Sequence, residues 1–518
     1  MESIFAKTEP FFRFEHHFRR LVKKSADIRR RSVGTSQVAC LLQPAFFAIF
    51  AASCSNKQDA IAISDILQSP PPSAILMFMK KYYLATYGCQ MNEYDSAMIA
   101  QQLDARGCIQ TTNKEHADFI IVNTCSVREK AEETAIVNIS KLKHLRKKNP
   151  DVKVVVCGCM AKNRGPELLK RLKNVSYIVG PDQYRKIPEL LLDGADSPLH
   201  KTHHRMFIDE DREENYLGEY AKLQSDVSTF VTIQRGCNKR CSYCIVPYLR
   251  GPEKYRDMND VLTEVKMAAD KGISEVMLLG QTVNAYKTAD ADFATLLTKV
   301  SEIGGIKRIR FTSPHPRHYT NELIDVLLSN PKVCHYAHIP LQSGSDAILK
   351  KMRRQHNMEQ YMTVIEQLRS KDPFYGISTD VICGFVGETA EDFEQTIKAF
   401  EACQFDNAFM FIYSPREGTE SAKETEILSA EEKSERHSRL VELQNAITLK
   451  RNQMMLGRTE ELLVEQESTR DESELRGRTD NYKKVVFKPE EGRIIKPGDY
   501  VKVKLDDIRG WTIRGTLV

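Results

Sequence analysis

The sequence predicts an α/β protein built from three consecutive domains: an open parallel-sheet domain, a partial (β/α)6 barrel and a small all-β barrel. Strand-like apolar runs alternate with amphipathic helical stretches from residue 81 onward, which is typical of parallel sheets with helical crossovers. After residue 454 the pattern changes to short strands separated by turn signals. With 518 residues and 41% hydrophobic content, the chain is long enough for several separate cores.

The expected boundaries are 79–200 for the first domain, 222–453 for the barrel and 454–518 for the C-terminal domain. Residues 1–78 differ in composition and are interpreted as an extension, disordered or created by a mis-assigned start, with Met77 or Met79 as the true start. An organelle signal or a genuine, poorly ordered tail are the alternatives. The apolar run at 38–52 contains Gln43 and Pro44 and is too short to span a bilayer, so no membrane is expected.

Charge and cysteine content narrow the functional classes. The net charge is only +5, so a nucleic-acid partner must be argued from local charge. Thirteen cysteines, an odd number in a long Lys/Glu-rich chain, favour reduced thiols used for metal binding or catalysis over disulfides. We therefore expect a cytoplasmic protein, or an organellar one if the N-terminal segment is a transit peptide.

In the first domain, a cysteine follows each of three predicted strands. The strands are 82–87, 119–122 and 152–156, with helices expected at 95–105 and 127–147, and the cysteines are Cys89, Cys125 and Cys159. Ligands bind at the carboxyl ends of parallel strands, so these thiols can converge and hold an iron-sulfur cluster with one open iron. Packing as small buried hydrophobes and a zinc site with three sulfurs are the alternatives. Cys157 is assigned to packing.

The central domain carries the most specific motif of the chain. A strand at 230–234 leads into Cys237, Cys241 and Cys244 with the spacing C-x3-C-x2-C. Three thiolates from one loop can bind three irons of a 4Fe-4S cluster and leave the fourth for a chelating amino and carboxylate group, which S-adenosylmethionine (SAM) possesses. Zinc with a distant fourth ligand is the competing interpretation.

Further strands are predicted at 276–279, 308–312, 336–339, 377–382 and 408–413, which together with 230–234 make six. Chemistry in β/α barrels lies at the C-terminal strand ends, so the loops after these strands are expected to line the pocket. They are 280–282, 313–316, 342–345 and 384–389, although such Gly- and Ser-containing loops are also typical of plain turns. His315 and His338 are interpreted as structural.

The C-terminal domain is expected to bind RNA. A long helix at 430–454 precedes strands at 460–464, 484–487, 500–505 and 512–517. From Arg476 to the end, eleven Lys and Arg stand against six Asp and Glu, interleaved with aromatics that suit base stacking: Tyr482, Phe487, Tyr500 and Trp511. The alternative is a solvated surface on a small barrel.

Three segments, 86–92, 235–250 and 310–316, carry a resemblance to the methylthiotransferase family of radical SAM enzymes. The sequence is most similar to the branch that modifies N6-isopentenyladenosine in tRNA, and the resemblance runs from about Met79 to Val518. It implies a methylthiotransferase N-terminal domain, a radical SAM barrel and a terminal TRAM (OB-like) barrel. It further implies conversion of the isopentenylated adenosine next to the anticodon to its 2-methylthio derivative, with SAM as both radical source and methyl donor.

The resemblance also implies cofactors and site residues. Two 4Fe-4S clusters are expected, with Cys237, Cys241 and Cys244 holding the SAM cluster and the first three cysteines, Cys89, Cys125 and Cys159, holding an auxiliary cluster. Tyr243 would lie beside the SAM adenine. From the loops at the strand ends, Gly280, Gln281, Ser343 and Gly344 are the expected SAM-pocket residues. Val386 stands where the family has Pro, and His356-Asn357 where it has an aromatic residue and Thr.

The implied partners are tRNA, whose anticodon loop the terminal barrel would hold open, and an electron donor such as flavodoxin or ferredoxin. Two rival functions remain. One is a methylthiotransferase acting on threonylcarbamoyl-adenosine tRNA or on a ribosomal protein, against which the segment after Cys89 argues. The other is an RNA-binding protein whose clusters only sense redox state.

Overall fold

The computed structural model describes residues 79–518 apart from 127–128, 194–203, 212–219, 468–472 and 491. Within it, Lys80–Val518 form one compact unit. The expectations for residues 1–78 lie outside the described residues. None of the described helices is both long and apolar enough to cross a membrane.

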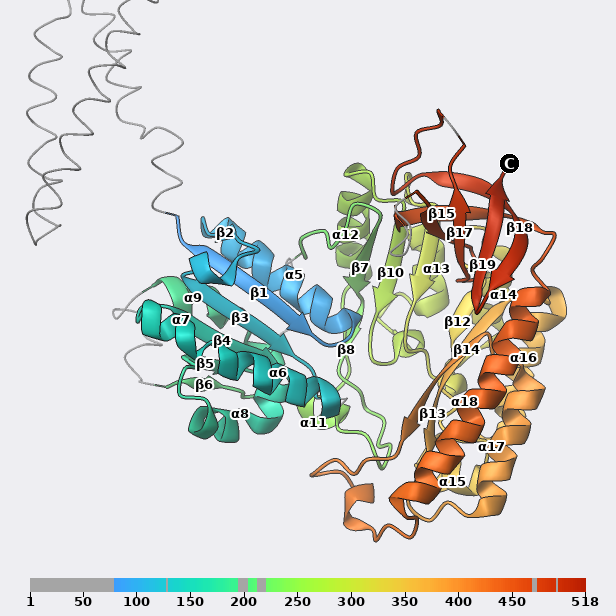
Figure 1. Ribbon diagram of the computed structural model, residues 1–518, viewed down its shortest axis with the longest axis horizontal. Helices are drawn as coiled ribbons and strands as arrows, with labels where there is room; N and C mark the ends of the chain where they lie inside the picture. The colour runs from blue at the N-terminus through green and yellow to red at the C-terminus, as the bar shows by residue number, and fades with distance from the viewer. Residues whose placement is uncertain (1–78, 127–128, 194–203, 212–219, 468–472, 491) are drawn as a thin grey trace, which may run out of the picture. The chain divides into compact units, whose positions relative to one another are not determined.

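The first domain is an open sheet of six parallel strands in the order β2-β1-β3-β4-β5-β6 (Figure 1). The three longest strands, which correspond to the three predicted apolar runs, lie side by side in its middle. The strands are β1 (Lys81–Tyr87), β2 (Ile109–Gln110), β3 (Phe119–Thr124), β4 (Lys153–Gly158), β5 (Tyr177–Val179) and β6 (Met206–Phe207).

Helices cover both faces of this sheet. On one face, side chains of α5 (Gln90–Ala105) and α9 (Lys186–Leu192) share a core with the fully buried Cys157. The other face is covered by α6 (Glu129–Lys141), α7 (Lys143–Lys148) and α8 (Cys159–Arg171). β3 and β4 are therefore buried on both sides, as expected for the centre of a parallel sheet.

Two helix boundaries differ from the sequence expectation. The single helix expected at 127–147 is two helices, α6 and α7, which meet at Leu142. Helix α5 begins at Gln90 instead of residue 95, because Cys89 and Asn92 form a reciprocal capping box that starts the helix directly after the strand. The periodicity of the apolar residues does not reveal such a cap.

The central domain contains the six predicted strands. β7, β10 and β11 pair in one parallel sheet and β12, β13 and β14 in a second, and a parallel bridge between Ile309 and Val333 links the two. One apolar core runs through both halves. The strands are β7 (Ser228–Thr232), β10 (Glu275–Leu279), β11 (Arg308–Phe311), β12 (Tyr336–His338), β13 (Gly376–Cys383) and β14 (Asn407–Ile412).

Helices connect successive strands of this partial barrel, as the right-handed crossover of parallel strands requires. They are α12 (Met258–Asp270), α13 (Phe293–Ser301), α14 (Asn321–Ser329), α15 (Asp346–Lys351), α16 (Met358–Lys371) and α17 (Ala390–Cys403). The long helix α18 (Ala430–Gln453) follows β14, begins with a Ser429 capping box and leads to the C-terminal domain.

The C-terminal domain is a closed barrel of five strands in the order β15-β16-β17-β19-β18. The sequence predicted four of them and missed β16, a four-residue strand with alternating burial whose Leu-Arg-Gly-Arg sequence carries only one apolar side chain. The strands are β15 (Thr459–Glu467), β16 (Leu475–Arg478), β17 (Lys484–Lys488), β18 (Tyr500–Arg509) and β19 (Thr512–Leu517).

The C-terminal barrel packs against the N-terminal ends of the central strands. Arg310 is fully buried and donates to the carbonyl oxygens of Asp480 and Thr479, at 2.8 and 2.9 Å. Tyr336, the first residue of β12, stacks on Tyr482 with ring centroids 4.3 Å apart. A β/α barrel carries its chemistry at the opposite ends of its strands, so this contact leaves the predicted site uncovered.

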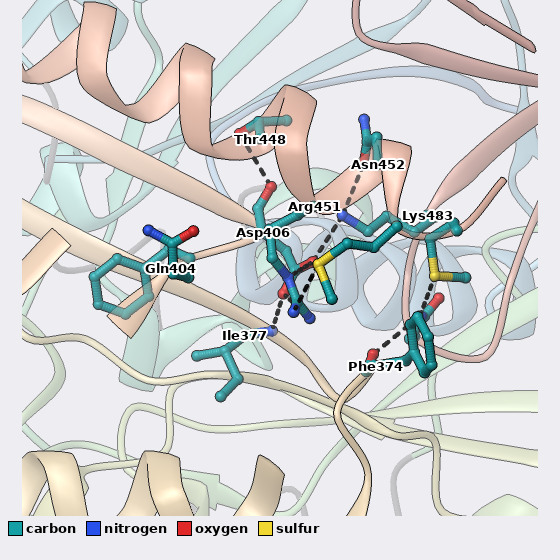
Figure 2. A network of polar contacts seen from close by, with 12 residues as sticks. Phe374, Ile377, Gln404, Asp406, Thr448, Arg451, Asn452 and Lys483 are labelled. Atoms are coloured by element: carbon teal, nitrogen blue, oxygen red, sulfur yellow. Dashed lines mark hydrogen bonds and ion pairs between the residues drawn. The ribbon is translucent and has the colours of Figure 1, made fainter. Parts of the chain in front are cut away.

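Asp406 lies at the centre of this junction, next to Arg451 of α18 and Lys483 of the loop before β17 (Figure 2), and it also contacts Arg369 of α16. Lys483 and Arg451 lie 2.7 and 3.2 Å from its Oδ1, and Arg369 lies 3.1 Å from its Oδ2. Burial alone raises the pKa of this carboxyl, but the three cations outweigh burial and hold the pKa below its usual value.

We expect Asp406→Asn to lower the free energy of unfolding by about 3 to 5 kcal/mol, because it leaves buried cations without their counter-charge. The measurement is the urea denaturation of the apo chain. Asp325→Asn is the matched control, since it removes an exposed carboxylate 3.7 Å from Lys371 and should cost at most about 1 kcal/mol. Equal losses of unfolding free energy in the two variants would contradict the role of Asp406 as the counter-charge of these buried cations.

Candidate cluster-binding site

The register of the first sheet brings its three cysteine loops to one edge. Tyr87 pairs with Thr124, and Thr124 pairs with Gly158, so the last residues of β1, β3 and β4 form one row across the sheet. The predicted cysteines follow that row by one or two residues: Cys89, Cys125 and Cys159.

Two buried asparagines lock the first two loops together. Asn92 Nδ2 donates to Asn123 Oδ1 at 3.1 Å and to the carbonyl oxygen of Thr124, while Asn123 Nδ2 donates to the carbonyl oxygen of Asn92. Both residues lie in segments that carry cysteines, but their role could not be inferred from the sequence, because the bonds join positions 31 residues apart.

Glycine is required directly before Cys159. Gly158 has φ +94°, and a Cβ there would lie 2.4 Å from Asn123 Oδ1. Cys125 and Cys159 are buried and Cys89 is exposed. Burial raises the pKa of Cys159, and the charge of Arg250 and a hydrogen bond from it offset part of that rise. The charge of Cys89 adds to the rise in the pKa of Cys159.

The second set of thiols lies on the loop between β8 (Gln234–Arg235) and α11 (Val246–Arg250). The loop is closed tightly: Cys237 N donates to the carbonyl oxygen of Gly251 at 3.1 Å. Gly236 has φ +72°, and a Cβ on it would lie 1.9 Å from the carbonyl oxygen of Pro252. This closure needs glycine on both steric and conformational grounds.

The three thiols of this loop interact with one another. Burial raises the pKa of Cys244 to about 12, and the charges of Cys241 and Cys237 add to that rise. Burial also raises the pKa of Cys237. Because iron binds thiolates, loading of a cluster would displace protons from these buried thiols.

Two polar side chains from barrel loops contact these sulfurs. Arg354 Nη1 donates to Cys241 Sγ at 3.5 Å, and Thr282 Oγ1 lies 3.5 Å from Cys237 Sγ. Hydrogen bonds to cluster thiolates tune the potential of an iron-sulfur centre. Arg354 was missed by the sequence analysis, since it lies 113 residues from the thiol that it contacts.

Both sets fit the clusters that the resemblance implies, because each combines three thiols from strand-end loops with hydrogen-bond donors around them. Among the described residues, no three His, Cys, Asp or Glu side chains stand at the spacing that a single metal ion requires. A 4Fe-4S cubane spreads its thiolates over separate irons and so takes a wider set.

Three of the expected SAM-pocket residues lie around the second set. Tyr243 is in the cysteine loop and packs edge-on against Phe385, with ring centroids 6.3 Å apart. Gln234 Oε1 accepts from the backbone N–H of Gln281 at 2.7 Å, and a Cβ on Gly280 would come equally close to it. Gln281 Oε1 is buried without a hydrogen-bond partner among the described residues, so it is available to a ligand.

The other two expected pocket residues are engaged by α17. Gly344 N donates to Thr396 Oγ1 at 3.0 Å, and a Cβ on Gly344 would lie 2.5 Å from the Thr396 Cα. Ser343 is buried, and its Oγ lies 3.5 Å from the same hydroxyl. The structure shows that Ser343 and Gly344 pack against α17, and their contact with SAM stays a prediction.

The buried His315 and His356 and the half-buried His318 form a group of imidazoles. The rings of His318 and His356 each lie 5.8 Å from that of His315. Burial, together with nearby cations, lowers the pKa of His318 to about 4 and that of His356 to about 3, and it lowers the pKa of His315 as well. The three imidazoles are therefore neutral near pH 7.

Models of three known families match successive parts of the chain. The uncharacterized protein family UPF0004 matches residues 81–180, the Radical SAM superfamily matches 231–400 and the TRAM domain matches 453–518. The radical SAM methyltransferase TsrM from Kitasatospora setae is similar at 14% identity and a TM-score of 0.49, over 67% of this chain and 77% of its own.

The partial barrel with its C-x3-C-x2-C loop defines a radical SAM protein. A tRNA-2-methylthio-N(6)-dimethylallyladenosine synthase from Methylacidiphilum infernorum is 39% identical, over 85% of this chain and 95% of the relative. The protein of the same name from Alkaliphilus oremlandii is 41% identical, over 85% and 93%. The chain belongs to the tRNA-2-methylthio-N(6)-dimethylallyladenosine synthase family.

The lowered histidine pKa values predict acid sensitivity. Below pH 6.5, histidines of the unfolded chain become protonated, whereas these imidazoles in the folded chain stay neutral. The free energy of unfolding therefore decreases as the pH is lowered from 6.5 to about 4 for His318 and to about 3 for His356. We expect His356→Phe to reduce this slope by up to about 1.4 kcal/mol per pH unit. Thermal denaturation of the apo chain at several pH values measures it.

The exposed residue His116 supplies the control, because His116→Gln also removes one imidazole but from the surface. A slope that is unchanged in His356→Phe, or reduced as much in His116→Gln, would show that burial of His356 is not the cause.

Proposed function

We propose that the chain is a radical SAM methylthiotransferase that converts N6-isopentenyladenosine next to the anticodon of tRNA to its 2-methylthio derivative, using SAM as radical source and methyl donor. The observation that carries the proposal is the presence of two three-thiol sets joined by one short helix. Ile245, which caps α11 directly after Cys244, and Leu249 within α11 form a buried apolar cluster with Cys159.

The cofactors are two 4Fe-4S clusters and SAM. Cys237, Cys241 and Cys244 would hold the cluster that delivers an electron to SAM, and the cysteines of the first domain, Cys89, Cys125 and Cys159, would hold the cluster that provides the sulfur. Each set separately would be compatible with electron transfer or sensing. Two sets on touching elements support group transfer.

Several side chains of this chain would position SAM. Arg354 is half-buried beside the thiols, and its buried Nε has no hydrogen-bond partner among the described residues, so it can receive the carboxylate of SAM. Gln281 Oε1 offers an acceptor, and Tyr243 an aromatic ring, on the same side of the barrel. Buried apolar residues around Tyr243 keep water from this region: Ile348, Met352, Phe385, Val386 and Tyr413.

The TRAM barrel at the C-terminus supports an RNA partner. The position of this barrel on the central domain suggests which part of the RNA it contacts. Arg308 and Arg310, at the start of β11, hold it to the end of the strands opposite the cysteine loop. A strand of five or six residues separates the two ends by roughly 17 to 20 Å. We therefore assign the TRAM barrel to RNA outside the anticodon loop, which replaces the expectation that the barrel holds that loop open, while the loop itself reaches the cysteines.

The remaining finer assignments concern the electron donor and the compartment. A flavodoxin or ferredoxin is proposed as donor, because cleavage of SAM at the cluster needs one low-potential electron. The cytoplasm is proposed as compartment, because the eleven described cysteines are all free thiols and the clusters need thiolates.

The function is tested by an anaerobic assay of the reconstituted chain with SAM, reductant and isopentenylated tRNA, followed by nucleoside mass spectrometry. We expect Cys89→Ala to form 5′-deoxyadenosine but to lose methylthio product by more than about 100-fold, since even residues behind the ligands cost 10- to 100-fold. Cys241→Ala should lose both products.

Cys108→Ala is the control, because Cys108 is a buried cysteine outside both sets. SAM cleavage by the wild type without any modified nucleoside would indicate another substrate, and absence of cleavage would overturn the radical assignment.

Trp511 allows a direct test of RNA binding by the C-terminal barrel. It is the only tryptophan of the chain, is 60% exposed and lies in the turn between β18 and β19. If it stacks on a base, tRNA will quench the emission of the chain. Trp511→Ala should then weaken binding by about 1 to 3 kcal/mol, whereas Trp511→Phe should lose less. Unchanged emission at saturating tRNA would rule out stacking there.

A further inference from the structure

Arg250 contacts elements of the first domain that carry two of the auxiliary thiols. It is the last residue of α11, the helix that begins directly after Cys244 and its cap Ile245. Its Nη2 donates to Asp95 Oδ2 at 2.8 Å, and Asp95 lies on α5, whose N-cap is Cys89. The guanidinium also forms a hydrogen bond with Cys159, the first residue of α8.

The contact is completely enclosed by protein. The Arg250 side chain is 4% exposed and the Asp95 side chain 0%. Tyr184 of the first domain donates its hydroxyl to the same Asp95 Oδ2 at 3.1 Å. A buried ion pair of this kind gains little net stability over apolar packing, so a role in specifying geometry is the better explanation for its presence.

The other end of the segment is equally constrained. Cys237 N is bonded to the carbonyl oxygen of Gly251, directly after Arg250. The segment from Cys237 to Gly251 is therefore a closed loop that holds all three SAM-cluster thiols and ends at the guanidinium. A movement of Arg250 relative to Asp95 would displace one thiol set against the other.

We infer that Arg250 is a positioning residue that sets the separation between the radical-generating cluster and the sulfur-carrying cluster, through its simultaneous contacts with Asp95 and Cys159. This inference rests on the proposed function. Arginine suits the task because its planar fork of N–H donors can hold a carboxylate and a sulfur at the same time, whereas the lysine ammonium is a single point charge.

The chemical consequence follows from proximity. The SAM-cluster thiols would place the radical source and the auxiliary thiols the sulfur, so the same adenine carbon must lie within reach of both. A misplacement of about 1 Å can cost on the order of 100-fold in rate. Loss of the Arg250 contact should therefore leave SAM cleavage intact but uncouple it from sulfur transfer.

The experiment compares Arg250→Gln/Asp95→Asn, which removes both charges so that neither is left buried alone, with Arg250→Lys. Both are reconstituted in the full chain with clusters. We expect the ratio of methylthio product to 5′-deoxyadenosine to fall by on the order of 100-fold in the double variant and by less in Arg250→Lys. Electron paramagnetic resonance spectra report the magnetic interaction between the two reduced clusters, which depends steeply on the distance between them. This interaction should change more in the double variant than in Arg250→Lys.

Glu264→Gln is the matched control. Glu264 is buried at the same junction, where it pairs with Arg256 at 2.6 Å and accepts from Tyr94 of α5 at 3.2 Å, but no thiol is among these partners. It should lower stability while leaving both the product ratio and the cluster interaction as in the wild type.

Three outcomes would overturn the inference: wild-type ratios and spectra in both Arg250 variants, an equal loss in Glu264→Gln, or uncoupling without any change in the magnetic interaction. If the double variant fails to fold, Arg250→Lys alone decides. A wild type that cleaves SAM but makes no methylthio product would overturn the proposed function instead, and the spectra would still test the inference.

Discussion

The structure depends on the register of parallel strands. The pairing of Tyr87, Thr124 and Gly158 across β1, β3 and β4 turns three cysteines that are far apart in sequence into neighbours at one edge. Because successive parallel strands all run in the same direction, their ends coincide without any contact between the loops themselves. The asparagine pair Asn92 and Asn123 then holds two of those loops in place.

Buried ion pairs form the contacts of the central domain with both of its neighbours. Arg250 with Asp95 joins the two thiol-bearing regions, and Asp406 with its three cations joins the central strands to the C-terminal barrel. Ion pairs in such positions add less to stability than to orientation, since their desolvation offsets most of their attraction. The two thiol sets and the C-terminal barrel thereby lie at opposite ends of the central strands.

Many features of the fold were predictable from local patterns. The alternation of apolar runs and amphipathic stretches predicted the six central strands, and C-x3-C-x2-C predicted the cysteine loop, because both signals lie within short windows. The missed strand β16 and the early start of α5 show the limit of such patterns. A strand with one apolar side chain and a helix started by a cysteine cap give no periodic signal.

The sequence by itself therefore determined the fold class, the two sets of three thiols and the family to which they point. Only the tertiary structure decided which side chains surround them: Arg354 beside Cys241, Arg250 beside Cys159, and the neutral histidine group. These contacts join residues about 90 to 113 positions apart or depend on burial, and neither property is encoded in spacing along the chain. The sequence also could not distinguish the expected pocket residues from one another. Only the structure shows that Ser343 and Gly344 pack against α17, whereas the side-chain oxygen of Gln281 remains available to a ligand.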